Sequence, residues 1–163
     1  MDLKVIKMSE EIISFLKSKF ADSIIEVTLE DRETSLTVKK EKFCEILSTL
    51  KYIGFNHLSD VTCVDYIKEQ EIEVVYHLWS HTKKLRGNIK VRISRESPSI
   101  KSVVDLWIGA QIHERENHEM FGITFLGNPN LSPLFLEEWE EIPPFRKDFN
   151  AREFVRREYY EKE

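Results

Sequence analysis

The densest group of chemically active side chains in this sequence lies between His113 and Gly122. The segment is His-Glu-Arg-Glu-Asn-His-Glu-Met-Phe-Gly, so imidazole, carboxylate and guanidinium groups stand close together. A zinc-binding helix needs two histidines four residues apart, because that spacing puts both rings on one helical face. His113 and His118 are five residues apart, which separates them by about 140° around a helix. We therefore predict no metal site here.

Three carboxylates in the same segment, Glu114, Glu116 and Glu119, could supply a general acid and a general base. Carboxylates are common on solvated helix faces, so this pattern is weakly specific. The sequence contains no Gly-x-Ser-x-Gly motif and no Gly-rich phosphate-binding loop. These residues favour a domain with a docking helix, and we assign no catalytic residue. A stand-alone, carboxylate-dependent hydrolase stays open as an alternative.

The charged segment is expected to be an amphipathic helix. Flanking apolar residues at spacings of three and four predict a buried stripe; they are Leu106, Trp107, Ile108, Ile112, Met120 and Phe121. Gly122 should end the helix in a left-handed conformation. Arg115 can reach Glu119 at i+4, but such a pair contributes only about 0.2–0.5 kcal/mol. That energy is too small to explain why so many charges gather here.

Composition restricts the class of protein. The 163 residues fit one domain, and an apolar fraction of 41% can build a core. A net charge of −5 argues against a general nucleic-acid binder. We expect no signal peptide and no membrane span, because long apolar runs are missing. Cys44 and Cys63 are expected to be free thiols, and two cysteines cannot hold a four-thiolate cluster.

The remaining pattern predicts an α+β fold in which a largely antiparallel sheet packs with helices. Helices are expected from Ser9, as N-cap, to Phe20 and from Lys40 to Tyr52, the second closed by Gly54. A short helix from about Ile100 to Trp107 should lead into the charged helix. Alternating apolar residues predict strands at 25–29 and 36–38, as a hairpin, and at 58–66, 71–79 and 85–94.

Beyond the charged helix, the sequence predicts an extended, Pro-containing C-terminal arm. Prolines 129, 133, 143 and 144 exclude long regular elements, and a helix is expected from Ala151 to Tyr160. We divide the chain into an α+β domain at 1–125 and an arm with its terminal helix at 126–163, which should dock on partner subunits. The arm should be mobile in the free chain and ordered in a complex. A partly buried ionic network is expected among Glu114, Arg115, Glu116 and Arg146.

Several segments, in the same order, resemble the NuoC-type subunit of respiratory complex I and its hydrogenase relatives. The residues 114–123 carry the most specific match, and segments 60–66, 73–78 with 90–92, 102–107, 125–131 and 145–149 agree with it. The resemblance covers about 58–149. It singles out as motif or interface residues Glu114, Arg115, Glu116, Glu119, Met120, Phe121, Gly122, Arg146, Lys147 and Asp148.

That resemblance implies a subunit without a cofactor of its own. Such subunits pack against a NuoD-like subunit, which in the hydrogenases is the nickel–iron large subunit, and lie near a NuoB-like iron–sulfur subunit. The partners would carry [4Fe-4S] clusters and, in a hydrogenase, a NiFe centre. The chain would be peripheral, held by those subunits at the cytoplasmic face of the membrane, and would complete an arm beside an ion pump.

Two departures from the family pattern concern the electron acceptor. Asn128 stands where quinone-reducing members usually carry His, and Ser132 and Pro133 replace two basic residues. The short chain also resembles archaeal hydrogenase-type complexes, and abundant Lys and Glu with only two Gln favours a thermophile. These features favour a membrane-bound [NiFe]-hydrogenase or its sulfur-reducing relative. A quinone-reducing complex stays open, as do the electron donor and the pumped ion.

Overall fold

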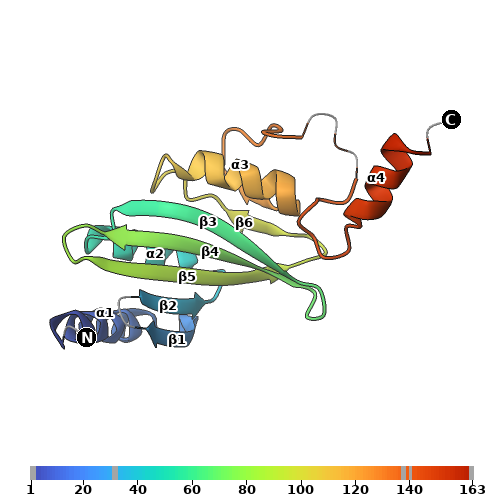
Figure 1. The fold of residues 1–163 in the computed structure, drawn as a ribbon. Coiled ribbons are helices and arrows are strands. Elements are labelled where there is room, and N and C mark those ends of the chain that lie inside the picture. The colour runs from blue at the N-terminus through green and yellow to red at the C-terminus, as the bar shows by residue number, and fades with distance from the viewer. Residues whose placement is uncertain (1–2, 31–32, 137–138, 140, 162–163) are drawn as a thin grey trace.

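A five-stranded sheet forms the centre of the computed structural model, which describes residues 3–30, 33–136, 139 and 141–161 (Figure 1). The strands lie in the order β1-β2-β5-β4-β3. They are β1 (Ile24–Glu30), β2 (Glu33–Val38), β3 (His57–Tyr66), β4 (Glu71–Ser80) and β5 (Leu85–Ser94). All neighbours are antiparallel except β2 and β5, so the prediction of a largely antiparallel α+β fold is confirmed.

Helix α2 (Phe43–Tyr52) connects two strands that lie far apart in the sheet. Strand β2 is parallel to β5, and β5 and β3 are both antiparallel to β4, so β2 and β3 run in the same direction. Parallel strands need a crossover connection, and α2 provides it across one face of the sheet. Helix α1 (Leu3–Phe20), which the turn η1 (Ala21–Ser23) joins to β1, packs Leu16 and Phe20 into the same core.

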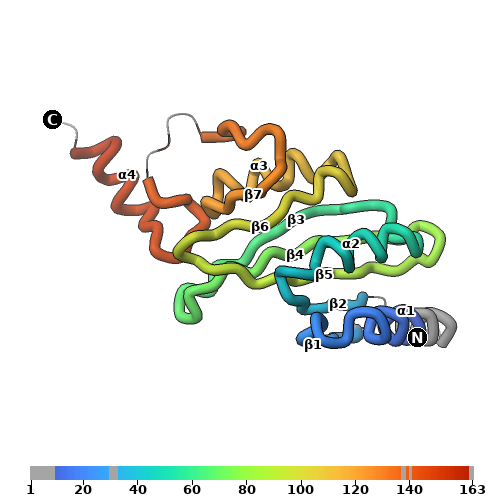
Figure 2. Tube along the Cα trace, turned by 180° about the vertical axis from the view of Figure 1, so that it is seen from behind, coloured from blue at the N-terminus to red at the C-terminus, as the bar shows by residue number. Residues whose placement is uncertain are grey.

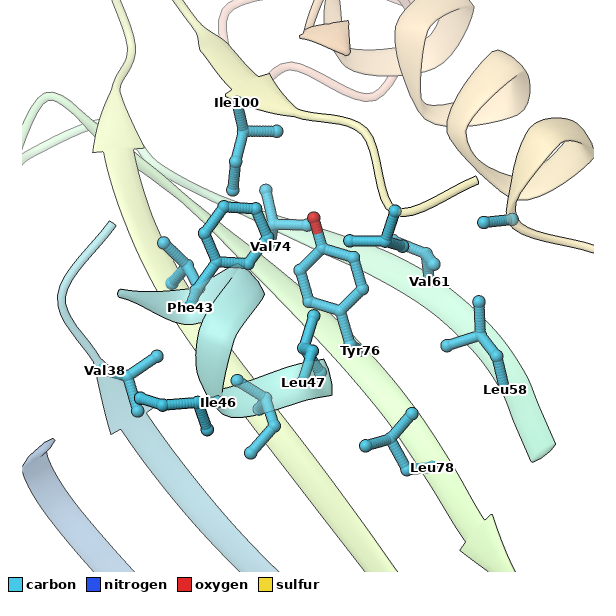
Figure 3. Close-up of a cluster of buried hydrophobic side chains, with 14 of the residues drawn as sticks. Val38, Phe43, Ile46, Leu47, Leu58, Val61, Val74, Tyr76, Leu78 and Ile100 are labelled. Carbon is cyan, nitrogen blue, oxygen red and sulfur yellow. The ribbon is translucent and has the colours of Figure 1, made fainter. Parts of the chain in front are cut away.

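Strand β4 shows how the alternating sequence builds the core. Its residues 72, 74, 76 and 78 are buried and point to the side of α2, while His77 and Trp79 point to the opposite face. Tyr76 lies at the centre, with its ring stacked on Phe43 at a centroid distance of 5.7 Å (Figure 3). Its hydroxyl is fully buried and has no hydrogen-bond partner among the described residues, and burial raises the pKa of this phenol well above its usual value.

Two predicted helix starts were wrong. Helix α1 begins at Leu3, so Ser9 lies inside the helix and is not its N-cap; the side chains of residues 3–9 are outside the described part. Residues 3–8 contain no Gly or Pro, so nothing in the sequence stops the helix there. Helix α2 begins at Phe43, after a turn at 40–42 that the apolar spacing did not reveal.

The predicted short helix from Ile100 to Trp107 was also wrong. Residues 99–101 form strand β6 (Ser99–Lys101), which pairs in parallel with β7 (Thr124–Leu126). Ile100 is fully buried opposite Phe125 in this pair. The amide of Ser102 donates to the Leu126 carbonyl at 2.8 Å. This amide is therefore not available for a hydrogen bond within a helix.

Helix α3 (Ala110–Phe121) lies along the free edge of β3. The Asn117 amide donates to the edge carbonyl of Val61 at 2.6 Å. Since an uncovered strand edge would pair with other chains, this helix shields it. The predicted apolar stripe was right for Trp107, Met120 and Phe121, which are buried, and wrong for Ile108 and Ile112, which are exposed. Two polar residues of the helix, Glu114 and Asn117, are buried as well. The strand edge presents polar backbone groups, and the polar side chain of Asn117 faces it.

The stretch 127–149, called the closing segment below, follows β7. Its described residues, which exclude 137, 138 and 140, form no helix or strand. It runs beside α3 and leads to α4 (Ala151–Tyr159), which confirms the predicted terminal helix (Figure 2). An aromatic cluster of Trp139, Phe149 and Phe154, with ring centroids 4.9–5.8 Å apart, fixes α4 to the end of the segment.

We predict that Tyr76→Phe stabilises the isolated chain. The substitution removes a buried hydroxyl that lacks a partner in the described part of the chain, and such a group costs about 1–3 kcal/mol. The free energy of unfolding, measured by chemical denaturation, should rise by about 1 kcal/mol. Tyr52→Phe is the control, because Tyr52 is 91% exposed and its hydroxyl stays hydrated. A loss of stability in Tyr76→Phe would show that the hydroxyl bonds to a group or water in solution.

Candidate functional site

Glu119 on α3 binds three consecutive backbone amides of the closing segment. The N–H groups of Leu134, Phe135 and Leu136 donate to its carboxylate at 3.2, 3.0 and 2.6 Å. Successive N–H groups that converge on one anion form a compact binding nest. Because the segment has no ladder of its own, this carboxylate supplies the acceptors that a strand neighbour would otherwise provide.

Arg115, one turn earlier on α3, binds the carbonyl groups just before those amides. Its guanidinium donates to the Ser132 carbonyl at 2.5 Å and to the Pro133 carbonyl. The Arg115–Glu119 pair that the i+4 spacing allows is not formed between these two described side chains. Instead, Arg115 donates to carbonyl groups of the closing segment, and Glu119 accepts from its amide groups.

Glu114 is completely buried where α3 meets the start of the turn after β6. Its oxygens accept from the Ser102 hydroxyl at 2.6 Å, the Val103 amide at 2.8 Å and the Asn128 side chain at 2.8 Å. Burial raises the pKa of this carboxyl above its usual value, although the three hydrogen bonds oppose the shift. The carboxylate thus joins three segments and presents no free oxygen to a substrate.

Gly122 lets the closing segment approach the C-terminal end of α3. The helix ends here with a left-handed φ of 73°, as predicted, and an added Cβ would lie 3.1 Å from Pro143 and 3.2 Å from Arg146. Arg146 donates to the Phe121 carbonyl at 2.8 Å, and the Phe145 amide donates to the Met120 carbonyl at 3.0 Å. These bonds satisfy terminal carbonyls of the helix, where a cation is also favoured by the helix dipole.

An ionic triad, in which Arg95 and Asp65 are buried and Asp148 is exposed, fixes the far end of the closing segment to the main sheet. Arg95, after β5, makes two bonds to Asp65 of β3 at 2.8 and 3.1 Å and one to Asp148 at 2.6 Å. The backbone amide of Lys147 adds a bond to Asp65 at 2.8 Å. Burial alone would raise the pKa of Asp65, but the hydrogen bonds from Arg95 and Lys147 and the Arg95 charge lower it overall.

The ionic network predicted from the sequence was wrong in its membership. Glu114, Arg115 and Arg146 bind backbone and neutral polar groups, and Glu116 has no hydrogen-bond or ion-pair partner among the described residues. Lys147 contributes through its backbone, while Asp148 belongs to the Arg95 triad. Sequence reasoning missed Arg95. Its only local signal was a charge directly after an alternating strand, and Asp65 lies 30 positions away.

The chemistry available to this arrangement is binding and positioning. Both oxygens of Glu114 and Glu119 are occupied, which weakens the hydrolase alternative. Across the described ranges, no group of three or more His, Cys, Asp or Glu side chains is arranged to hold a metal ion. Nor is any helix in that part of the chain both long and apolar enough to cross a bilayer.

We predict that Glu119→Gln loosens the closing segment. The neutral amide offers one acceptor oxygen instead of two and loses the charge that strengthens the three bonds. Hydrogen exchange at Leu134 to Leu136 should accelerate about tenfold, which corresponds to about 1.4 kcal/mol. Glu116→Gln is the matched control on the same helix and should leave these amides unchanged. Equal exchange in both variants would mean that the nest contributes nothing in solution.

Arg95→Ala should strongly destabilise the fold. Asp65 has no exposed side-chain surface, and removing the partner of such a buried charge typically costs about 3–5 kcal/mol. Arg156→Ala removes a guanidinium from an exposed pair with Glu161 and should cost only about 0–1 kcal/mol. Thermal and chemical denaturation of the two variants would compare them. Similar small losses would show that water reaches the triad.

Acid denaturation provides a second measurement of the same triad. The pKa values of Asp65 and Asp148 are both lowered by Arg95, so the folded chain binds protons more weakly than the unfolded chain. Their contribution to stability is complete above the unfolded value of about 3.9 and is lost as the pH falls through the lowered folded values. Arg95→Ala should therefore flatten the loss of stability below about pH 4.

Comparison with known proteins agrees with the resemblance seen in the sequence. The model for the family described as "Respiratory-chain NADH dehydrogenase, 30 Kd subunit" matches residues 36–155. A subunit of the NADH-quinone oxidoreductase of Citrifermentans bemidjiense is 38% identical over 136 residues, covering 82% of this chain and 84% of the relative. A subunit of the F(420)H(2) dehydrogenase of Methanosarcina mazei is 38% identical over 147 residues, covering 86% and 90%.

Two solved structures share the fold. A chain of the membrane-bound sulfane sulfur reductase, an archaeal respiratory membrane complex, has a TM-score of 0.84 at 29% identity, covering 93% of this chain and 91% of that one. The trypsin-resistant fragment of Nqo5 has a TM-score of 0.61 at 27% identity, covering 79% and 100%. With a family match of this length and relatives of this identity, the chain belongs to the 30 Kd subunit family of the respiratory-chain NADH dehydrogenase and is a subunit of a complex I-like assembly.

Proposed function

We propose that this chain is a non-catalytic structural subunit in the peripheral arm of a complex I-related, ion-pumping membrane complex. In this proposal α3, the closing segment and α4 dock on a NuoD-like large subunit, near a NuoB-like iron–sulfur subunit. The partners carry the [4Fe-4S] clusters and any NiFe centre, and this chain carries no cofactor. It is held peripherally at the cytoplasmic face of the membrane by those subunits.

The observation that supports the proposal most directly is the use of the charged side chains on α3. Glu114, Arg115 and Glu119 hold the closing segment, so their function is to present a shaped surface. That surface exposes large apolar side chains: Phe135 is 63% exposed, Phe145 57% and Ile142 45%. Exposed apolar groups on an ordered segment are typical of a protein interface.

For the reaction of the complex, we favour a [NiFe]-hydrogenase or its sulfur-reducing relative. The supporting observation is the likeness to a chain of the sulfane sulfur reductase, which extends over 93% of this chain. The Asn128, Ser132 and Pro133 departures from the quinone-reducing pattern support the same choice.

A quinone-reducing complex is the second candidate. It is favoured by the 38% identity to a subunit of the NADH-quinone oxidoreductase of Citrifermentans bemidjiense. Both candidates require the same docking role of this chain and differ only in the partner that performs the chemistry.

Purification of the native complex after gentle detergent extraction separates these possibilities. Mass spectrometry of the subunits should find a NuoD-like and a NuoB-like protein with this chain. Nickel in the complex would indicate a hydrogenase, while a large subunit without nickel ligands would leave a choice between sulfur and quinone reduction, to be resolved by activity assays. Recovery of this chain alone, with turnover of its own, would contradict the structural role.

We predict that Arg115→Ala reduces assembly without altering turnover in the complexes that form. The substitution releases the Ser132 and Pro133 carbonyls, so the docking surface loses its fixed shape. Quantitative mass spectrometry should show less of this chain per large subunit, and activity should fall in proportion.

Lys68→Ala is the control for that experiment, because Lys68 is exposed in the β3–β4 turn and should not affect assembly. Normal assembly of Arg115→Ala would show that its contacts are dispensable. Normal assembly with abolished turnover would mean instead that Arg115 takes part in the chemistry.

A further inference from the structure

One edge of the main sheet is left open. Strand β3 forms one edge, which α3 covers, and β1 forms the other. Helix α1 covers a face of the sheet and not this edge, because its Ile13 and Leu16 lie beside Leu36 of β2. No described element lies beyond β1 in Figures 1 and 2, and among the described residues only β2 forms a ladder with β1.

Strand β1 has few of the features that protect an open edge. An edge strand presents every second backbone N–H and C=O away from its neighbour, and such edges are commonly protected by Pro, Lys or a bulge. Residues 24–30 contain no Pro, Gly or Lys, and the one bulge lies near the start, at Ile25. Two large apolar side chains are exposed on the strand, Ile25 by 65% and Leu29 by 48%. The edge is therefore suited to pairing with another strand.

The register with β2 shows which side chains of β1 share a face. Three residues, Ile24, Val27 and Leu29, are opposite the core-facing row of β2, while Glu26 and Thr28 are opposite the outer row. Ile25 is the extra residue of the bulge, because Ile24 and Glu26 are opposite consecutive residues of β2. An incoming strand must match this order, with apolar residues on the core side.

We propose that β1 pairs antiparallel with β1 of a second copy of this chain, centred on Val27, so that two sheets join into one. An open strand edge is completed by another extended backbone, whose main-chain groups provide the missing donors and acceptors. A second copy offers such an edge, with the same length and the same open backbone groups. The resulting dimer has a two-fold axis at Val27, so both copies use the same surface.

The residues of β1 are complementary to themselves in this register. With the bulge counted as one position, Val27 meets Val27 of the second copy, Leu29 meets Ile24, and Thr28 meets Glu26. The core side of the new strand pair is thus entirely apolar. Pairing centred on Glu26 or on Thr28 would place two glutamates directly opposite each other, which destabilises a strand pair. The charges on the strand therefore select one register.

The proposed contact is independent of the docking role. Strand β1 lies at the opposite edge of the sheet from β3, on which α3 lies, so pairing leaves α3 and the closing segment free. One strand pair is a small interface, so the dimer should form at high concentration and dissociate on dilution.

The first test is disulfide trapping of Val27→Cys in the isolated full-length chain. In the proposed register the two introduced thiols are directly opposite each other, with Cβ atoms about 4.5–5.5 Å apart, so mild oxidation should link most of the chain into dimers. Leu29→Cys is the matched control. Its two thiols would lie four positions apart, about 13 Å along the strands, and should not link.

The control is stringent, because Leu29 is exposed and Val27 is partly buried, so random collisions would link Leu29→Cys more readily. Both variants keep Cys44 and Cys63, which therefore contribute equally. Equal linking in the two variants, or none in Val27→Cys, would overturn the proposed pairing.

Charge substitution at Thr28 provides the second test. Thr28 meets Glu26 of the second copy twice in each dimer, so Thr28→Glu should raise the dimer dissociation constant about tenfold and Thr28→Lys should lower it. Sedimentation equilibrium over a range of concentrations measures both constants. A shift in the same direction for both variants, or an unaltered chain that stays monomeric at high concentration, would refute the dimer. These measurements involve no partner subunit, so the proposed function would stand in either case.

Discussion

The position of the closing segment depends on one constraint: a chain without a helix or strand must still satisfy its backbone donors and acceptors. Here α3 does so with charged side chains of both signs. Glu119 accepts from three amides and Arg115 donates to the two carbonyls that precede them. Hydrogen bonds with one charged partner are about twice as strong as neutral ones. The combination of carboxylate and guanidinium on one helix follows from that need, whereas mutual pairing of the two would leave the segment unheld.

The other end of the segment is held by electrostatics of a different kind. Asp65 and Asp148 share Arg95, and Arg146 lies close enough to help lower the pKa of Asp65. Two carboxylates near two guanidinium groups leave the cluster close to neutral, which reduces the cost of burial. Because Asp65 belongs to β3 and Arg95 follows β5, the closing segment is tied to the sheet as well as to α3. Attached at both places, the closing segment keeps its orientation relative to the sheet and α3.

Local patterns predicted the elements whose burial is regular along the chain. Strands 58–66, 71–79 and 85–94 lie within one residue of the observed β3, β4 and β5, because each alternates between a core face and an open face. The errors lie where tertiary contacts replace periodicity. Ile100 was assigned to a helix, yet it forms a strand because Phe125, 25 residues later, pairs with it. Asn117 is buried because it meets the edge of β3, and Glu114 because it meets the turn after β6 and Asn128. Residue spacing along one helix does not reveal either contact.

The candidate site shows the same division between what local patterns predict and what tertiary contacts decide. The sequence predicted one ionic network among four residues, Glu114, Arg115, Glu116 and Arg146. Three of them bind backbone or neutral polar groups instead, and side-chain types along the sequence do not reveal such partners. Arg95 was missed for a related reason: it follows β5, its partner Asp65 belongs to β3, and the two meet only through the arrangement of the sheet. Strand order and register are set by the whole sheet, so spacing along the chain gives no sign of such a contact.

The structure shows what the three residues that depart from the quinone-reducing pattern do in this chain. Asn128 donates to the buried Glu114, and Ser132 and Pro133 contribute only their backbone carbonyls to Arg115. All three therefore act inside this subunit, where they shape the closing segment. A change at these positions alters the shape of that segment, so its link to the electron acceptor is indirect. Under the proposed function, the acceptor is selected in the partner subunits, and this chain acts on that choice only through the fit of its docking surface.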